Sequence, residues 1–390
     1  MKRVYFDHIA STPVHPKVTE AMLPYLDKFY GNPQSLHSFG QETASAIESA
    51  RERVAQLIEA EAEEVFFTSS GTESNNFAIK GIALAQRTKG THIVVSAVEH
   101  QSVLHSMKAL EKFGFSVTEV PVDPFGFVDP EDVRKAITPQ TCLVSVMLAN
   151  GEVGTIEPVA DIAKVCQEQG VLCHTDAVDA VGNIPVSVKK LGVDALSLAG
   201  NQFYGPTGSA ALFLKKGTRC LPQIDGGIQE SGKRAGSENI AGIVGLGMAA
   251  EVAKGELSVR ANKLTLLRNT IIERMEAEMD HVILTGHPTE RLPHHASFCV
   301  KFIEGEAMLL NLDMKGIAAA SGSACTSRAL KASHVLLAMG LDHATAQGSL
   351  VFSLVENNTE DDVDYLFECF PAIIERLRQM SPLYPNQEEE

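Results

Sequence analysis

The sequence predicts an α/β fold with a mostly parallel sheet covered by helices on both faces. Between Glu63 and Leu214, seven short β-rich runs alternate with stretches of helical character. This alternation of strands and helices is typical of parallel sheets, since each crossover helix packs on a face of the sheet. The seven runs are Val65–Thr68, His92–Ala97, Ser116–Val120, Cys142–Leu148, Val171–Thr175, Ala195–Leu198 and Ser209–Leu214.

The helical stretches are amphipathic, which is the second observation behind this fold class. The stretch before the first run carries apolar residues every three or four positions, as expected for a helix that packs one face on the sheet. These residues are Ala44, Ile47, Ala50, Val54, Leu57 and Ile58.

The third observation is length, because 390 residues suggest two domains rather than one. A long helical segment from Asn239 to Met279 is expected to connect the first domain to a smaller α/β domain. The strands expected there are Val282–Leu284, Ala296–Val300, Ile317–Ala319 and Leu350–Leu354, followed by a helix from Thr359 to about Gln379.

Charge and composition argue against several classes of function. The 33 Lys and Arg residues against 49 Asp and Glu give a net charge of −16, which disfavours nucleic acid and anionic membranes as partners. The sequence has no run of about 18 apolar residues and no signal-like start, so we expect a cytoplasmic protein. Its seven cysteines contain no CxxC pair, which argues against disulfides and structural zinc.

Polar residues follow three of the predicted strands. The segment Phe67–Glu73 turns from a strand into a helix, where backbone N–H groups could face an anion. His100 could stack on a planar ligand, and the carboxylate of Asp176 suits a pyridinium nitrogen. Each feature alone is explained as well by a turn, a helix cap or a surface group. Together they point to one crevice at the carboxyl edge of the sheet.

Several segments complete a pattern that extends along the chain: Tyr5–Asp7 with Ala10–Pro13, Gly31–Pro33 with Ser35–His37, Thr68–Asn76, Glu99–His100, Phe203–Pro206, Arg234–Asn239 and Ser321–Ser327. In these segments the chain resembles the cysteine desulfurases, class V aminotransferases of the pyridoxal phosphate (PLP) fold type I. The likeness runs from about residue 3 to residue 377.

The resemblance implies a large domain with a mostly parallel seven-stranded sheet over residues 15–258. Residues 1–14 and 259–380 would form the small domain, and residues 381–390 a flexible tail. It also implies that Gly71, Thr72, His100 and Asp176 contact PLP, and that Ser237 reaches the phosphate of a neighbouring subunit. A homodimer is therefore expected.

Cys325 matches the family's catalytic cysteine, which takes sulfur from the substrate and carries it as a persulfide. Its small polar neighbours favour an exposed thiol, which could pass sulfur to an iron–sulfur scaffold or another acceptor protein. It could also serve as one ligand of an iron–sulfur cluster. The alternative is an inert cysteine in a packed loop.

Six positions depart from the family pattern. Gln202 stands where the family has the lysine that forms the Schiff base with PLP, and an amide has no nucleophilic amine. Asn201 and Ala199 replace the neighbouring histidine and the phosphate-binding serine, while Gly151 and Asp179 replace an asparagine and a glutamine beside the cofactor's phenolate. We expect an anionic Asp179 to repel that phenolate. The sixth change is Val351, in place of the arginine that grips the substrate carboxylate.

Two interpretations follow. In the first, the chain is a desulfurase-like homodimer without PLP catalysis that relays sulfur, or supports cluster assembly, through Cys325 or by docking a partner. In the second, it is an active enzyme, either with noncovalently bound PLP or with a different activity that uses Asp179, Asp176 and His100 as acid–base groups. Covalent attachment of PLP at position 202 is excluded in both, and binding of PLP is doubtful.

Overall fold

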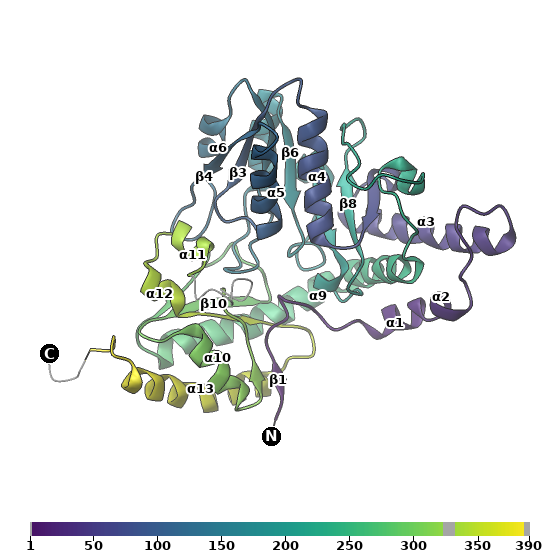
Figure 1. Cartoon of the computed structure of the whole chain (residues 1–390). Helices are drawn as coiled ribbons and strands as arrows, with labels where there is room; N and C mark the ends of the chain where they lie inside the picture. The colour runs from purple at the N-terminus through teal and green to yellow at the C-terminus, as the bar shows by residue number, and fades with distance from the viewer. Residues whose placement is uncertain (1, 323–331, 386–390) are drawn as a thin grey trace.

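The large sheet has seven strands in the order β2-β8-β7-β6-β5-β3-β4 (Figure 1). The computed structural model describes residues 2–322 and 332–385. Strand β8 runs antiparallel to both of its neighbours, and the remaining pairs are parallel. The predicted fold class is confirmed. The strands are β2 (Val65–Thr68), β3 (His92–Ser96), β4 (Ser116–Val120), β5 (Thr141–Ser145), β6 (Leu172–Asp176), β7 (Ala195–Ala199) and β8 (Ala210–Leu214).

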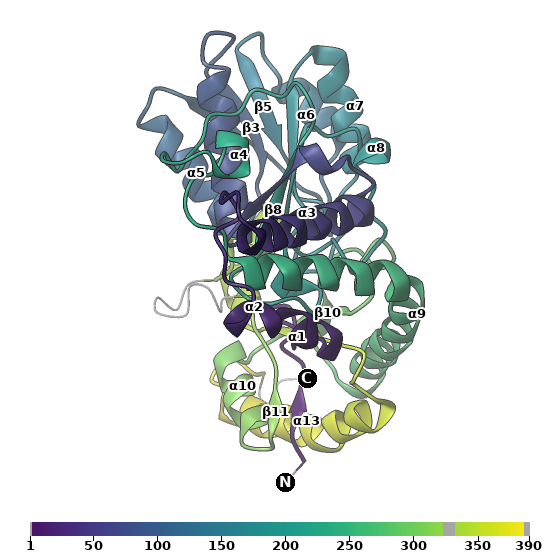
Figure 2. The same cartoon turned by 90° about the vertical axis from the view of Figure 1, so that its right-hand side faces the viewer.

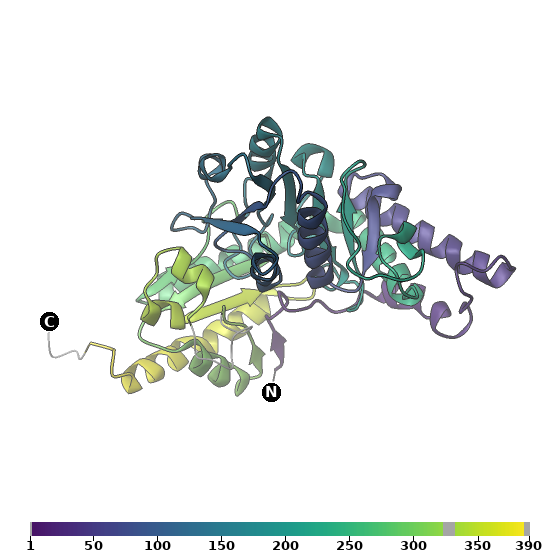
Figure 3. The same cartoon turned by 45° about the horizontal axis from the view of Figure 1, so that its top comes forward.

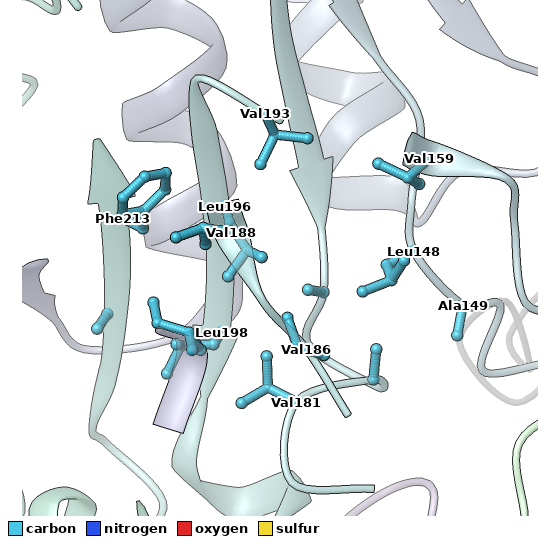
Figure 4. Close-up of a cluster of buried hydrophobic side chains, with 14 of the residues drawn as sticks. Leu148, Ala149, Val159, Val181, Val186, Val188, Val193, Leu196, Leu198 and Phe213 are labelled. Carbon is cyan, nitrogen blue, oxygen red and sulfur yellow. The ribbon is translucent and has the colours of Figure 1, made fainter. Parts of the chain in front are cut away.

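Helices cover both faces of this sheet. Successive side chains of each strand point to opposite faces, so both faces present apolar side chains that the helices bury. Phe66 packs with α4 (Gly71–Ala85) and α5 (Gln101–Glu111), whereas Val65 and Phe67 belong to the core on the other face. Figure 4 shows part of that second core, including Leu196, Leu198 and Phe213. Its helices include α3 (Ser38–Ile58), α6 (Pro130–Ala136), α7 (Val159–Gln169), α8 (Val188–Leu191) and the first part of α9.

Helix α9 (Ile240–Glu278) is 39 residues long and serves two cores. Ile243 and Ala253 are buried under the large sheet, while Leu264 and Met275 are buried in a separate core. Figure 2 shows α3 lying along α9. The predicted domain boundary at residues 258–259 falls inside this continuous helix and stays a prediction.

The separate core that contains Leu264 and Met275 surrounds a three-stranded antiparallel sheet in the order β12-β10-β9. Its strands are β9 (Val282–Leu284), β10 (His295–Val300) and β12 (Ser349–Ser353), packed with α10 (Gly305–Asp313) and α13 (Glu360–Met380) (Figure 3). The predicted strand at Ile317 exists as β11 (Ile317–Ala318), but it pairs with β1 (Val4–Tyr5) in a two-stranded sheet. The N-terminal segment therefore starts on the small-domain side of the molecule.

The remaining helices are short: α1 (Pro16–Met22), α2 (Pro24–Asp27), α11 (His334–Ala338) and α12 (His343–Gln347). Across residues 2–322 and 332–385, no helix is long and apolar enough to cross a membrane. Five cysteines in these ranges are buried and Cys369 is partly buried.

Candidate functional site

The loops that follow β2 and β6 touch each other at the carboxyl edge of the sheet. Gly71 begins α4 directly after β2, and a Cβ added there would lie 2.6 Å from Cγ2 of Val178. Val178 lies between Asp176, the last residue of β6, and Asp179. Only a residue without a side chain allows this approach, so Gly71 brings the predicted phosphate loop next to both carboxyl groups.

A protein carboxylate occupies part of the helix terminus that was predicted to hold an anion. Glu73 accepts a hydrogen bond from Ser69 N at 2.9 Å, and Arg234 Nε lies 2.8 Å from its Oε1. Burial works against ionisation, yet the hydrogen bonds from Arg234 and Ser69 hold the pKa of Glu73 below its ordinary value. This ion pair fixes the loop of Ser237 beside α4. Ser237 itself is exposed, and its role across a subunit interface stays a prediction.

A chain of hydrogen bonds connects Asp176 to His100. Asn75 Nδ2 donates to Asp176 Oδ2 at 2.6 Å and to Ser102 Oγ at 2.9 Å, and His100 Nδ1 lies 2.7 Å from the same Oγ. Burial raises the pKa of Asp176, while the charge of His100 lowers it. The structure thus brings two predicted residues together through Asn75, which we missed although it lies inside the segment Thr68–Asn76.

His100 also has the structural role that the sequence left open. Its Nδ1 accepts a hydrogen bond from Ser102 N at 3.1 Å and so caps the N-terminus of α5. The residue is exposed, so its ring remains accessible to a planar ligand.

Gln202, which the resemblance aligns with the family's lysine, lies in a short 3₁₀ turn directly after β7. The side chain is 8% exposed, and its Nε2 donates a hydrogen bond to the backbone oxygen of Ile9 at 2.8 Å. Beside it, Asn201 O accepts a hydrogen bond from Thr12 N at 2.9 Å. Ala199 is buried at the end of β7. The side chain of Gln202 and the backbone of Asn201 therefore hold the N-terminal segment, a contact that no sequence pattern indicated.

The side chain of Asp179 lies against the backbone of Gly151. A Cβ built on Gly151 would collide with Asp179 Oδ2 and lie 3.0 Å from its Cγ, so the aspartate fills the space that a side chain at 151 needs. Burial, together with the charge of Asp176, raises the pKa of Asp179 to about 8. Our expectation of an anionic Asp179 is therefore wrong near neutral pH, where the buried carboxyl is mostly protonated and can donate a hydrogen bond.

Two further positions lie on the small-domain side. His295 Nε2 donates to Gly151 O at 2.9 Å, which links β10 to the turn after β5. His295 was not predicted, and its place next to a predicted strand was the only signal. Val351 is buried in β12 and exchanges backbone hydrogen bonds with Ala320 at 2.8 and 3.0 Å. Its side chain carries no charge that could bind a carboxylate. Cys325 lies outside the described residues.

We call Asn75, His100, Gly151, Asp176, Asp179 and Gln202 the strand-end site.

A model of the aminotransferase class-V family matches residues 4–366. The cysteine desulfurase IscS of Dictyoglomus turgidum is 49% identical over 98% of this chain and 97% of its own length. The chain belongs to the cysteine desulfurases of this family. The IscS protein of Methanosarcina thermophila is 47% identical over 99% of this chain and 95% of its own length.

Solved structures of the family have the same fold. A structure described as a NifS-like protein superimposes with a TM-score of 0.90 at 37% identity, covering 96% of this chain and all of that one. A structure of SspA in complex with cysteine gives a TM-score of 0.82 at 31% identity over 91% of this chain. The architecture of the family is thus kept along the whole matched length.

The family depends on PLP, but the residues of the strand-end site do not fit covalently bound PLP. Gln202 has no amine, and its amide is already hydrogen-bonded to Ile9 O. Asp176 remains as a partner for a ring nitrogen, and protonated Asp179 would not repel a phenolate. Noncovalent contact with part of the cofactor is therefore compatible with the site, whereas the family's Schiff base is not.

Proposed function

We propose that this protein works in sulfur mobilisation as a homodimer without PLP catalysis, and that Cys325 is its working residue. The observation that carries the proposal is the hydrogen bond of Gln202 to Ile9 O, which gives the lysine position a structural role. An amide can neither form an imine with a cofactor nor remove the substrate's α-proton. The protein must then receive sulfur from a donor that has already mobilised it.

Cys325 would receive it by persulfide exchange. Its thiolate attacks the outer sulfur of a donor persulfide, the S–S bond of the donor breaks, and the donor leaves as a thiolate. The sulfane sulfur moves without net oxidation, so no further reagent is needed. Cys325 could then pass the sulfur to an iron–sulfur scaffold protein, or supply one thiolate ligand to a cluster.

The first test concerns covalent PLP and desulfuration. After incubation with PLP and borohydride, we expect no pyridoxyl group on any residue of the strand-end site, and sulfide release from L-cysteine at background level. Gln202→Lys alone should not restore sulfide release, because Val351 and Ala199 still lack the carboxylate and phosphate contacts. Sulfide release well above background, from the unmodified protein or from this variant, would contradict the proposal.

The second test concerns Cys325. A desulfurase loaded with ³⁵S-persulfide should label the protein, and Cys325→Ser should lose at least about nine-tenths of the label. Cys369→Ser is the matched control, because Cys369 is the partly buried cysteine among the described residues. Equal labelling of the Cys325 variant and its control would leave Cys325 without this role.

One observation favours a second candidate, a different acid–base activity at the strand-end site. Burial, and then the charge of Asp176, raises the pKa of Asp179 to about 8, and a carboxyl group that titrates near neutral pH is suited to general acid–base catalysis. Asp179→Asn distinguishes the candidates: it leaves persulfide labelling of Cys325 unchanged under the first proposal and abolishes turnover under the second.

A further inference from the structure

Strand β2 lies at one edge of the large sheet and, among the described residues, pairs with a strand on one side only. Its outer side nevertheless has hydrogen-bond partners. Arg51 Nη1 of α3 donates to Val65 O at 2.8 Å, and Phe67 N donates to Glu230 Oε2 at 2.9 Å. Val65 and Phe67 present their backbone groups to the same side, because alternate residues of a strand do so. Two side chains therefore take the place of a neighbouring strand.

Arg51 and Glu230 are bound to each other as well as to the strand. Nη1 of the arginine lies 2.7 Å from Glu230 Oε2, and Nη2 lies 2.9 Å from Oε1. The two side chains are only 11% and 4% exposed, so this bidentate pair is shielded from solvent. Arg51 Nε donates to Glu48 Oε1 at 3.2 Å, so each nitrogen of the guanidinium has a partner. The pair thus differs from an exposed ion pair, which contributes little to stability.

Glu230 reaches the strand from a turn with an unfavourable backbone conformation. Residues 230–232 have φ angles of 48°, 56° and 75°, so three successive residues lie in the left-handed region. Glu230 and Ser231 carry side chains, and such residues keep this conformation only where surrounding contacts support it. The ion pair with Arg51 supports the start of the turn. The ion pair of Arg234 with α4 holds the chain just after it.

We propose that Arg51 and Glu230 are positioning residues that close the free edge of β2 and hold the loop of Ser237 in place. Glu230 and Ser237 belong to the same loop, so a fixed carboxylate at one limits where the other can lie. The inference goes beyond the proposed function, because it does not depend on the role of Cys325.

The orientation of this ion pair matters as well as its charge. Val65 O needs a donor and Phe67 N needs an acceptor, and Arg51 and Glu230 supply them in that order. With the charges reversed, a carboxylate would face the carbonyl oxygen and a guanidinium would face the N–H group. A reversed pair would keep the attraction between the two charges but lose both hydrogen bonds to the strand.

The experiment compares Glu230→Ala, Glu230→Gln and the reversed pair Arg51→Glu/Glu230→Arg with the unmodified protein. Hydrogen exchange of the Phe67 amide reports the edge of β2. The rate of trypsin cleavage after Lys233, measured by mass spectrometry, reports the loop.

Two controls accompany these variants. Exchange at the amide of Val94, buried in β3, measures general destabilisation, and exchange at Phe67 is expressed relative to it. Lys216→Glu/Glu63→Lys reverses an ion pair whose side chains are exposed and 3.0 Å apart. This control should stay within about twofold of the unmodified protein in both readouts, since exposed pairs contribute little.

Exchange of the Phe67 amide should be at least about tenfold faster in Glu230→Ala, because hydrogen bonds to charged groups are the stronger ones. The reversed pair should exchange at least as fast. Trypsin should cleave Glu230→Ala after Lys233 at least about fivefold faster, since the turn loses the contact that supports it. If Glu230→Ala does not fold, Glu230→Gln is the test, and its single acceptor oxygen should make Phe67 exchange at least about threefold faster.

Unchanged Phe67 exchange in the folded Glu230 variants would overturn the closing of the edge. A reversed pair that restores slow exchange would overturn it too, because attraction between the charges would then suffice. Unchanged cleavage after Lys233 would overturn the hold on the loop. A failure of the proposed function looks different: Cys325→Ser still accepts sulfur, while the Glu230 variants change both readouts as expected.

Discussion

Burial raises the pKa of single carboxyl groups in and near the strand-end site. Burial raises the pKa of Asp179 to about 8, so its carboxyl group is mostly neutral at pH 7, as the amide expected there from the resemblance would be. Two other buried carboxyl groups nearby in the sequence, Glu152 and Glu157, have pKa values raised to about 8 for the same first reason. Each binds a proton in the folded protein that the unfolded chain releases above pH 4 to 5.

This shift predicts how stability depends on pH. Between about pH 4 and pH 8, folded Asp179 keeps its proton while the unfolded chain has lost it, so stability falls as the pH rises, by up to about 1.4 kcal/mol per pH unit. Asp179→Asn removes this term. Urea unfolding should show little change at pH 4 and a gain of about 2 kcal/mol or more at pH 8.

The control for this measurement is Asp161→Asn, an exposed position on α7. Its pH profile should follow the unmodified protein. A profile of Asp179→Asn parallel to that of the unmodified protein would mean that Asp179 is ionised in the folded state.

Among the elements, the N-terminal segment connects the two parts of the molecule. Phe6 N donates to Ala318 O at 2.8 Å, and Ile9 N donates to Ser353 Oγ at 2.7 Å. Three residues on, Thr12 N donates to Asn201 O beside Gln202. The segment is therefore hydrogen-bonded to the small-domain strands at one end and to the strand-end site at the other.

We expect Gln202→Met to loosen this segment, because methionine keeps the length of the side chain and loses the donor to Ile9 O. Hydrogen exchange at the amides of Thr12 and Tyr204 should become about fivefold faster, as expected from a lost hydrogen bond of about 1 kcal/mol. Gln167→Met on the exposed face of α7 is the control. Equal exchange in both variants would show that Gln202 does not hold the segment.

Elements were predicted better than the site, for a physical reason. Strands such as Val65–Thr68 and Val282–Leu284 have the predicted bounds, because their apolar runs are local patterns. The contact of Gln202 with Ile9 joins residues 193 positions apart. The protonation of Asp179 depends on burial, which a local pattern does not show. The contact of Gln202 with Ile9 and the protonation of Asp179 both arise from tertiary packing alone.

At the scale of the whole molecule, apolar side chains are exposed at one end. Leu36 is 93% exposed, Tyr30 72% and Leu26 66%, all within the stretch that connects α1 to α3. Figure 1 shows this stretch projecting beyond the large sheet. Such a concentration of exposed apolar side chains marks an interaction surface. A second copy of the chain is the expected occupant, because the retained Arg234–Asn239 loop completes a neighbour's site in the family.

We therefore expect a homodimer in light scattering at micromolar concentration. Leu36→Glu should shift the protein towards monomer by at least about tenfold in dissociation constant, since a buried charge without a partner opposes association. Leu310→Glu, on α10 and 67% exposed, is the matched control and should stay dimeric. Monomer alone for the unmodified protein would refute this expectation.

The close contact between Gly151 and Asp179 makes the two positions interdependent. An asparagine introduced at 151 would place its Cβ 3.0 Å from Asp179 Cγ and cannot fit without moving the aspartate. Because the two residues compete for one space, the free-energy cost of a substitution at 151 depends on the residue at 179. The two positions therefore have to be substituted together rather than one at a time.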